Sequence, residues 1–500
     1  MKISFENKML NCYKDIYHQI KYVQETCENV VPDVNDDIGK IASVQSTVHL
    51  KSKDLTGRGV LISGEAIASV IYVTESEKNV SFVRLSKQFS LEYEIPGMSS
   101  DVIAQIRLDI QNTEARIINP RKLSVTFEIC GELNCFREGH IPIKTVQTDK
   151  VPCKIHTRLN KTKVMCTNAV CEKTFTLSEQ LIFPSGKPSP SQIAMLKTSF
   201  ELNDSQNVGS KLIVKGNLNF CLCYLSEEVN YPVKAEFSTP FSQIIDLAVD
   251  KLDSYNALVE ISSVYYDVIN TISGEKALDT EVHAVLQISA RQSKEIEYIS
   301  DVYSNIMPSH CGLSSQSLTS YSALQQTKLI ADERLSVVDD CNDVLSVFTN
   351  VSLLKLQGEK INATVNLDII YRTKNGTLSA ARRSINLSGD CQSNPERLVS
   401  ALLTDIYLRP DGASIDVHAA VDIKYICSKK AEIMFVADVE LDEENAYDFS
   451  SFPAIYLVKA ETEDLWTLAK NYHSSIEKIS ASNLLEDGIC GKLLLIPKSV

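Results

Sequence analysis

The sequence lacks the features that mark membrane-spanning, secreted and nucleic-acid-binding proteins. No stretch comes near the roughly 18 uninterrupted apolar residues that a bilayer span requires, and residues 1–15 have no apolar core of the kind found in signal peptides. The net charge of −14 argues against a nucleic-acid partner, because phosphate contacts need clustered lysine and arginine. Without a secretory signal, the 14 cysteines indicate reduced thiols in a cytoplasmic protein.

Motifs of enzyme chemistry are missing as well. The sequence contains no G-x-S-x-G, no H-E-x-x-H and no phosphate-binding P-loop. We therefore expect a protein that is not an enzyme and that carries no cofactor.

Seven cysteine and histidine residues are the strongest candidates for a metal site. They are Cys130, Cys135, His140, Cys153, His156, Cys166 and Cys171. Structural zinc needs four ligands in tetrahedral reach, usually as two close pairs, and the C-x4-C spacing found here lies at the loose end of that range. Because buried free thiols are common on strands, we favour a structural role and assign no metal, while the zinc alternative stays open.

The 500 residues are too many for one hydrophobic core, and domain sizes predict three or four folding units. Short runs with period-two alternation, such as Phe89–Ile95, predict strands with one buried face. Residues 10–24 fit an amphipathic helix or a strand. In the helix their apolar side would hold Tyr13, Ile16, Tyr17, Ile20 and Val23.

A strand-like pattern recurs three times along the chain. Runs that end in Tyr72, Tyr224 and Tyr371 are spaced by 152 and 147 residues. Phe89 and Phe241 each follow their tyrosine by 17 residues. A closing strand recurs as Val125–Ile129, Val282–Ile288 and Val417–Ile423. We therefore predict three tandem β-rich domains at residues 25–160, 165–310 and 320–440.

The C-terminal segment has a different pattern. A short strand at Tyr456–Val458 precedes a helix whose apolar stripe is formed by Leu465, Leu468, Ala469 and Tyr472. Ser475 is the predicted N-cap of a second helix, and Leu493–Ile496 form a closing strand. This predicts a small β-α-α-β domain at residues 453–498. The acidic segment 440–452 is predicted to be a flexible tether.

The order of landmarks in this segment resembles a LysM domain. It reads V-K, L-W-T-L-A-K-x-Y, I-E-K-I, S-N-L and G-K-L-L-x-I-P. Residues 461–464, Glu-Thr-Glu-Asp, stand where the family usually carries Gly-Asp-Thr. Family members that bind N-acetylglucosamine polymers use this loop and the loop after the second helix. By that resemblance, the partner-binding residues are Glu461, Glu463, Asp464, Trp466, Asn483, Leu484 and Leu485.

The repeats resemble the SPOCS domain of spore-coat morphogenetic proteins. The first repeat carries G-x-A-x-x-x-x-I-Y, a phenylalanine-led strand and N-P-R-K-L-x-V. SPOCS domains followed by a LysM domain are the layout of SipL-like proteins, and SpoVID-like proteins are similar. The resemblance implies a scaffold in the mother-cell cytoplasm at the outer surface of the forespore. Its tail would bind the coat-basement ATPase SpoIVA or, alternatively, peptidoglycan.

Overall fold

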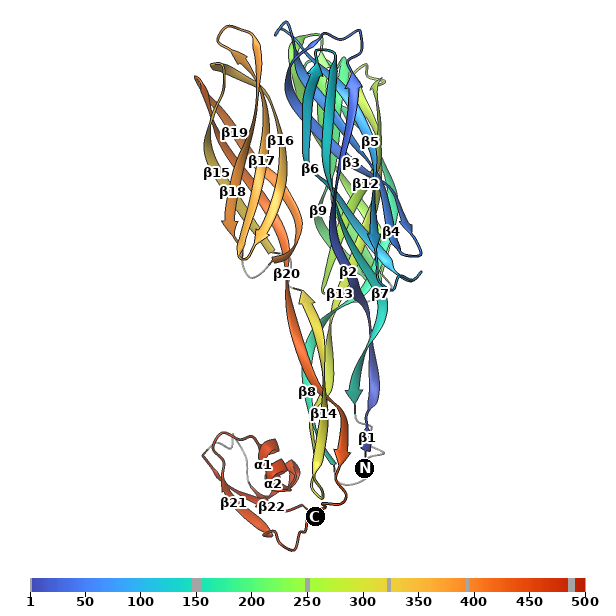
Figure 1. Ribbon diagram of the computed structural model, residues 1–500, viewed down its shortest axis with the longest axis vertical. Helices are drawn as coiled ribbons and strands as arrows, with labels where there is room; N and C mark the ends of the chain where they lie inside the picture. The colour runs from blue at the N-terminus through green and yellow to red at the C-terminus, as the bar shows by residue number, and fades with distance from the viewer. Residues whose placement is uncertain are drawn as a thin grey trace.

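The structure, a computed structural model, describes residues 2–145, 155–247, 252–321, 325–391, 395–483 and 491–499. It is mainly β, as the sequence predicts. Figure 1 shows a wide head of long strands, a narrow stalk and a small tail at the foot of the stalk. The head consists of three six-stranded units, and the tail is formed by residues 453–499. The stalk comprises residues 2–14, 137–145, 155–166, 292–304, 309–321 and 428–441.

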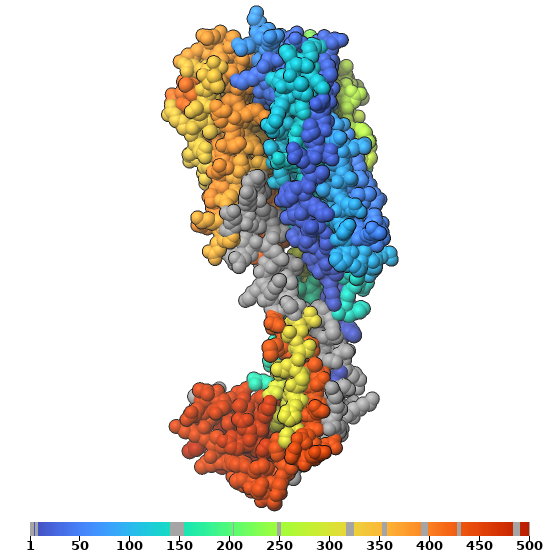
Figure 2. Space-filling view, in the orientation of Figure 1, coloured from blue at the N-terminus to red at the C-terminus, as the bar shows by residue number. Residues whose placement is uncertain are grey.

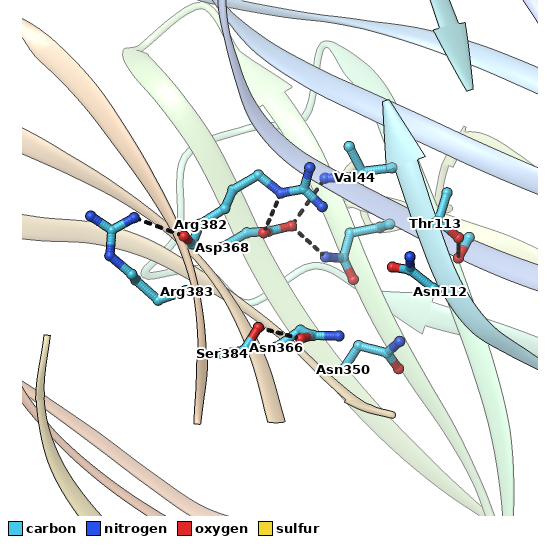
Figure 3. Close-up of a pocket in the computed structure, with 11 residues that line it drawn as sticks. Val44, Asn112, Thr113, Asn350, Asn366, Asp368, Arg382, Arg383 and Ser384 are labelled. Atoms are coloured by element: carbon cyan, nitrogen blue, oxygen red, sulfur yellow. Dashed lines mark hydrogen bonds and ion pairs between the residues drawn. The ribbon is translucent and has the colours of Figure 1, made fainter. Parts of the chain in front are cut away.

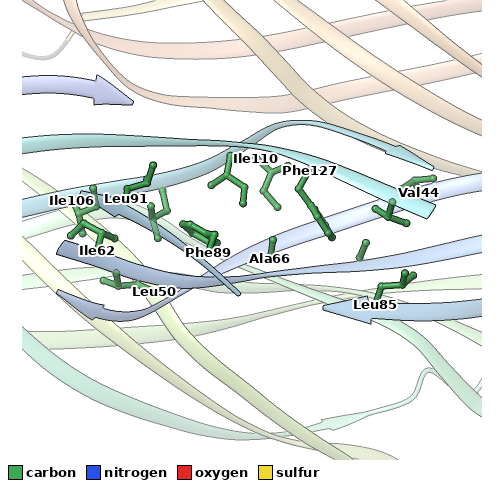
Figure 4. Packing of buried hydrophobic residues seen from close by; sticks show 14 of the residues in the cluster. Val44, Leu50, Ile62, Ala66, Leu85, Phe89, Leu91, Ile106, Ile110 and Phe127 are labelled. Carbon is green, nitrogen blue, oxygen red and sulfur yellow. The ribbon is translucent and has the colours of Figure 1, made fainter. Parts of the chain in front are cut away.

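Unit 1 is a sandwich of two antiparallel layers of three strands each. Its strands are β2 (Glu6–Val30), β3 (Ile38–Leu55), β4 (Gly59–Thr74), β5 (Val80–Glu94), β6 (Ile103–Asn119) and β7 (Lys122–Thr145). One layer has the order β2-β7-β6 and is part of a six-stranded sheet, and the other has the order β3-β4-β5. Apolar side chains of both sheets meet between them, among them Phe89 and Phe127 (Figure 4). Two half-buried sheets thus share one core.

Strand β5 shows how the sequence produces this arrangement. Phe89, Leu91 and Tyr93 are buried, whereas the intervening Ser90 and Glu92 are exposed. Successive side chains of a strand point to opposite faces, so an alternating sequence places every second residue in the core. The strand predicted over this segment is confirmed.

Strand β2 decides between the helix and the strand expected for residues 10–24. The helix considered for residues 10–24 is wrong, because the whole segment lies inside this strand and pairs with β7. The register shifts between Asp15 and Tyr17, which marks a β-bulge or similar irregularity. A bulge interrupts the period-two alternation, and Ile16 and Tyr17 both pack against the core of unit 1. This break gave the sequence a spacing similar to that of a helix.

Units 2 and 3 repeat the strand order of unit 1. Unit 2 has β8 (Ile155–Ile182), β9 (Gln192–Val208), β10 (Lys211–Ser226), β11 (Val229–Asp246), β12 (Ser254–Asn270) and β13 (Lys276–Ser304). Unit 3 has β15 (Gln325–Ser336), β16 (Cys341–Gln357), β17 (Lys360–Thr373), β18 (Leu378–Asp390), β19 (Pro395–Asp411) and β20 (Ser414–Leu441). In each unit the first, last and fifth strands are neighbours in one layer, and the second to fourth strands form the other layer. Pairing of β2 with β8 at Tyr13 and Thr167 joins the first layers of units 1 and 2 into one six-stranded sheet.

The recurring tyrosines occupy the same place in each unit. Tyr72, Tyr224 and Tyr371 lie near the end of the middle strand of the three-stranded meander, and each is fully buried. The hydroxyl of Tyr72 donates to the Asp36 carbonyl (3.0 Å), and that of Tyr224 donates to the Pro188 carbonyl (2.8 Å). In units 1 and 2 the ring therefore fills the core while the hydroxyl anchors the loop between the first two strands.

The three units also share a core with one another. Buried residues from the meander sheets of all units form one cluster, with Ala42, Ile71 and Val73 from unit 1, Ala194, Met195 and Cys223 from unit 2, and Phe348, Ile370, Leu378 and Ala380 from unit 3. Strand β4 is consequently buried on both faces from Ser69 to Thr74. The head is thus held together by apolar packing between its units.

The stalk is formed where strands continue beyond the head. Strands β8 and β13 pair down to Ile155 and Ser304, and β20 pairs with β14 (Ser309–Tyr321) and with the short β1 (Lys2–Ser4). Strands β8, β13 and β20 have 28, 29 and 28 residues, so each spans head and stalk. Small clusters, such as Phe5, Ile299, Val302 and Val436, keep the stalk packed.

The tail has the order strand, helix, helix, strand. Its elements are β21 (Ile455–Lys459), α1 (Leu465–Asn471), α2 (Ile476–Ser482) and β22 (Leu493–Pro497). Ser475 caps α2, as predicted, and Asp464 caps α1. Its core includes Leu468, Ile479 and Leu494. Neither of these short helices could cross a membrane, and no other helix is described.

Candidate interaction surfaces

The tail packs against the stalk through the Asp301 carboxylate of β13. It accepts a hydrogen bond from the indole Nε1 of Trp466 (2.8 Å) and from Nζ of Lys470 (2.8 Å to each oxygen). Both donors belong to α1, and Trp466 is buried. One partly buried carboxylate therefore fixes both the position and the rotation of this helix. Figure 2 shows the tail against the lower end of the stalk.

Tyr303, two residues along β13, forms the apolar part of this joint. Its ring packs edge to face against Trp466, with 4.8 Å between the ring centroids, and stacks on His156, with 4.9 Å between the centroids. Its hydroxyl donates to the Ser474 carbonyl (2.9 Å). Burial raises the pKa of Tyr303, which keeps the hydroxyl protonated as a donor. A stalk residue is thus part of the tail's own core.

Asp464 links the acidic loop of the tail to the stalk. It accepts from the Thr467 backbone N–H (2.9 Å) as the N-cap of α1, and it pairs with Arg158 of β8 (2.8 Å). Hydrogen bonds from Thr467 and the charge of Arg158 lower the pKa of Asp464. The pair with Arg158 is exposed, so its contribution to stability is small.

The predicted partner-binding residues that the structure describes do not lie together on one open surface. Asp464 and Trp466 face the stalk, whereas Glu461 and Glu463 are exposed. Asn483 clamps β22, because its side chain donates to the Leu495 carbonyl (2.7 Å) and accepts from the Leu495 N–H (2.8 Å). The other two predicted residues, Leu484 and Leu485, lie outside the described residues. The role of the set stays a prediction.

The segment predicted to be a tether makes contacts at both ends. The Tyr447 N–H donates to the carbonyl of Ile306 (3.0 Å), in the turn between β13 and β14, and the ring centroids of Tyr447 and His473 in the tail are 4.0 Å apart. Lys498 donates to the Phe449 carbonyl (2.9 Å). Acidic composition suggested a free linker, but the aromatic residues among the carboxylates pack on the tail. These contacts oppose the flexibility that the sequence predicts for this segment.

A second set of polar contacts joins unit 1 to unit 3. Asp368 of β17 is buried and accepts from Ser43 Oγ (2.9 Å), the Val44 N–H (3.0 Å) and Arg382 Nε (3.0 Å). Val44, Asp368 and Arg382 line a polar pocket of about 220 Å³ between the units (Figure 3). Because a buried carboxylate needs paired charge and hydrogen bonds, this constellation is suited to holding the units in register. This cluster was not predicted from the sequence, although Asp368 inside the apolar run of β17 indicates a buried carboxylate that needs partners.

Six of the seven cysteine and histidine residues considered for zinc lie in the part of the chain that the structure describes. Burial raises the pKa of the Cys130, Cys166 and Cys171 thiols to about 11, so these thiols are protonated at neutral pH. Within the described part of the chain, no three or more histidine, cysteine or acidic side chains are placed to hold a metal ion. Cys153 lies outside the described residues.

The geometry defines the architectural class of the protein. A head of three antiparallel β-sandwiches is carried on a stalk, and a small α/β tail packs against that stalk. Comparison with protein families is more specific, because the model described as "SipL, SPOCS domain" matches residues 37–118. That span covers β3 to β6, four of the six strands of unit 1. The match shows that residues 37–118 are similar to the SPOCS domain of SipL. No curated protein and no solved structure matches the chain.

Proposed function

We propose that this protein is a non-enzymatic scaffold of spore-coat assembly. It acts in the mother-cell cytoplasm, where it links a SpoIVA-like coat-basement ATPase to the forespore surface. The single observation that carries the proposal is the SipL SPOCS match on a unit whose strand order recurs twice more in the chain. Three copies of one sandwich around a common core provide a large and rigid set of binding surfaces.

The tail is the proposed protein-binding module. It projects beyond the head on the stalk, and the joint at Asp301 holds it in one orientation. Glu461 and Glu463 form an exposed acidic loop that can pair with lysine or arginine of a partner. Such pairs at the edge of an interface act mainly on the rate of association and are screened by salt.

The test is binding of the whole chain to a purified SpoIVA-like ATPase. Ile479→Asp places a charge in the tail core, where Ile479 is fully buried, and we expect it to lower affinity at least tenfold. Ser480→Asp is the matched control, because it adds the same charge at the exposed neighbouring position of α2. Equal affinity of the Ile479 variant and the unchanged chain would contradict the role of the tail. Combined reversal of Glu461 and Glu463 to lysine should weaken binding more at low salt than at high salt.

Peptidoglycan binding is the second candidate, because the tail has both the order of LysM landmarks and a strand-helix-helix-strand arrangement. Cosedimentation of the whole chain with purified peptidoglycan separates the two candidates. We expect no saturable pelleting. Strong pelleting that the Ile479→Asp substitution abolishes would favour the glycan.

A further inference from the structure

The ribbon formed by β21 and β22 has one face that is covered and one that is not. Tyr456, Val458, Leu494 and Ile496 point toward the helices and belong to the tail core. The opposite face carries Ile455, Leu457, Leu493 and Leu495, which are 56, 66, 65 and 43% exposed. Leu457 lies directly opposite Leu495 in the antiparallel register. These four residues are called the aliphatic face below.

The aliphatic face departs from the usual pattern of a strand with one buried side. A ribbon that faces solvent normally places polar residues outward, and single exposed leucines are common on protein surfaces. Four large aliphatic side chains on neighbouring positions of one ribbon form a contiguous patch, and such patches mark interaction sites. None of the four is needed for the tail core, which the alternate residues already fill.

The stalk leaves this face uncovered. The joint is made by α1, through Trp466 and Lys470, and by Ser474, which follows that helix. The helices and the aliphatic face lie on opposite sides of the ribbon, because the inward residues of β21 and β22 pack with both helices. The orientation that the Asp301 joint imposes on α1 therefore keeps the aliphatic face accessible.

We infer that the aliphatic face is the docking surface for a partner protein that presents an apolar strip with a carboxylate beside it. Lys459 supplies the positive charge for that carboxylate. It follows Leu457 on the same side of β21 and is exposed. Its exposed ammonium group can pair with an acidic residue of the partner. Pairing of the face with a second copy would instead bring two lysines to one small patch. The face carries few polar groups that could bind the hydroxyls of a glycan.

This inference rests on the proposed function and names the surface that the tail uses. The experiment measures binding of the whole chain to the purified SpoIVA-like ATPase. Leu457→Ser combined with Leu495→Ser should raise Kd at least tenfold, because docked aliphatic side chains at the centre of an interface contribute most of its affinity. Lys459→Glu should also raise Kd, whereas Lys478→Glu, on the exposed surface of α2, should not.

Fluorescence of Trp466, the only tryptophan, verifies folding of each variant, because its indole lies in the joint between tail and stalk. Loss of binding with unchanged emission supports the docking surface. If Ile479→Asp abolishes binding but the double serine variant binds normally, the inference fails and the proposed function stands. If neither substitution affects binding, or the whole chain does not bind, both fail. A dimer in solution that the double serine substitution dissociates would identify a second copy as the occupant and overturn the inference.

Discussion

Strand β5 of the head and strand β22 of the tail follow the same alternation but differ in what they expose. The outward residues of β5 include Ser90, Glu92 and Glu94, whereas those of β22 are Leu493 and Leu495. In both strands the buried residues hold the fold together, so alternation reveals the core equally well. The exposed residues carry the difference, since polar groups suit water and aliphatic groups suit a partner. The outward face is therefore where the function of a strand can be inferred.

The first prediction tests this comparison by truncating one buried side chain and one outward-facing side chain. Phe127→Ala in the fully buried core of unit 1 should lower the free energy of unfolding of the head by about 3–5 kcal/mol. Leu457→Ala should change stability by no more than about 0.5 kcal/mol, because this side chain is two-thirds exposed. Urea unfolding followed by circular dichroism measures the first effect, and Trp466 fluorescence measures the second. A destabilisation of the tail by several kcal/mol would show that the aliphatic face is structural.

The second prediction concerns the pH dependence of the stability of the head. Burial raises the pKa of Glu260 in β12 to about 8, although Arg107 and the Leu108 backbone of unit 1 partly oppose the shift. The folded protein thus keeps a proton that the unfolded chain releases above its ordinary pKa of about 4.5. The contribution of this group to stability is fully present below about 4.5 and is lost as pH rises to about 8.

Glu260→Gln removes this titration. The melting temperature of the unchanged chain should therefore fall relative to that of the variant between pH 5 and pH 8. Parallel melting curves at all pH values would contradict the assignment. Glu275→Gln, at an exposed position of the same unit, is the control that should leave the pH dependence unaltered.

The smallest of the three effects concerns the joint between tail and stalk. Asp301→Ala leaves Trp466 Nε1 and Lys470 without their acceptor, which should destabilise the docked tail by about 1–3 kcal/mol. We expect the emission of Trp466 to shift to longer wavelength and proteolysis within residues 442–454 to become faster. Asp279→Ala, an exposed position on the same strand, should change neither. Identical digestion of both variants would show that Asp301 does not hold the tail.

The sequence predicted those parts of the molecule that depend on local patterns. The alternation at Phe89–Ile95 identified a strand, the recurrent tyrosines revealed equivalent core positions, and Ser475 was recognised as a helix cap. Each of these signals lies within one element or repeats at a fixed distance, so a single sequence is sufficient to read it.

The contacts between elements could not be predicted in the same way. Asp301 and Trp466 are 165 positions apart, and Asp368 and Ser43 are 325 apart, so no spacing in the sequence connects them. Residues 10–24 illustrate a second limit, because a break in register at Asp15 made a strand resemble a helix. The predicted partner-binding loop shows a third. Its residues were identified by type, but which of them face the stalk depends on how the tail is docked.

The length of β20 determines how the molecule carries mechanical load. This strand begins in unit 3, continues through the stalk and ends at Leu441, just before the segment that leads to the tail. Along its path it pairs with β15 and β19 in the head and with β14 and β1 in the stalk. A pull on the tail along the stalk therefore acts parallel to these strands. It loads many backbone hydrogen bonds in shear at once, so tension on the tail is distributed into the head.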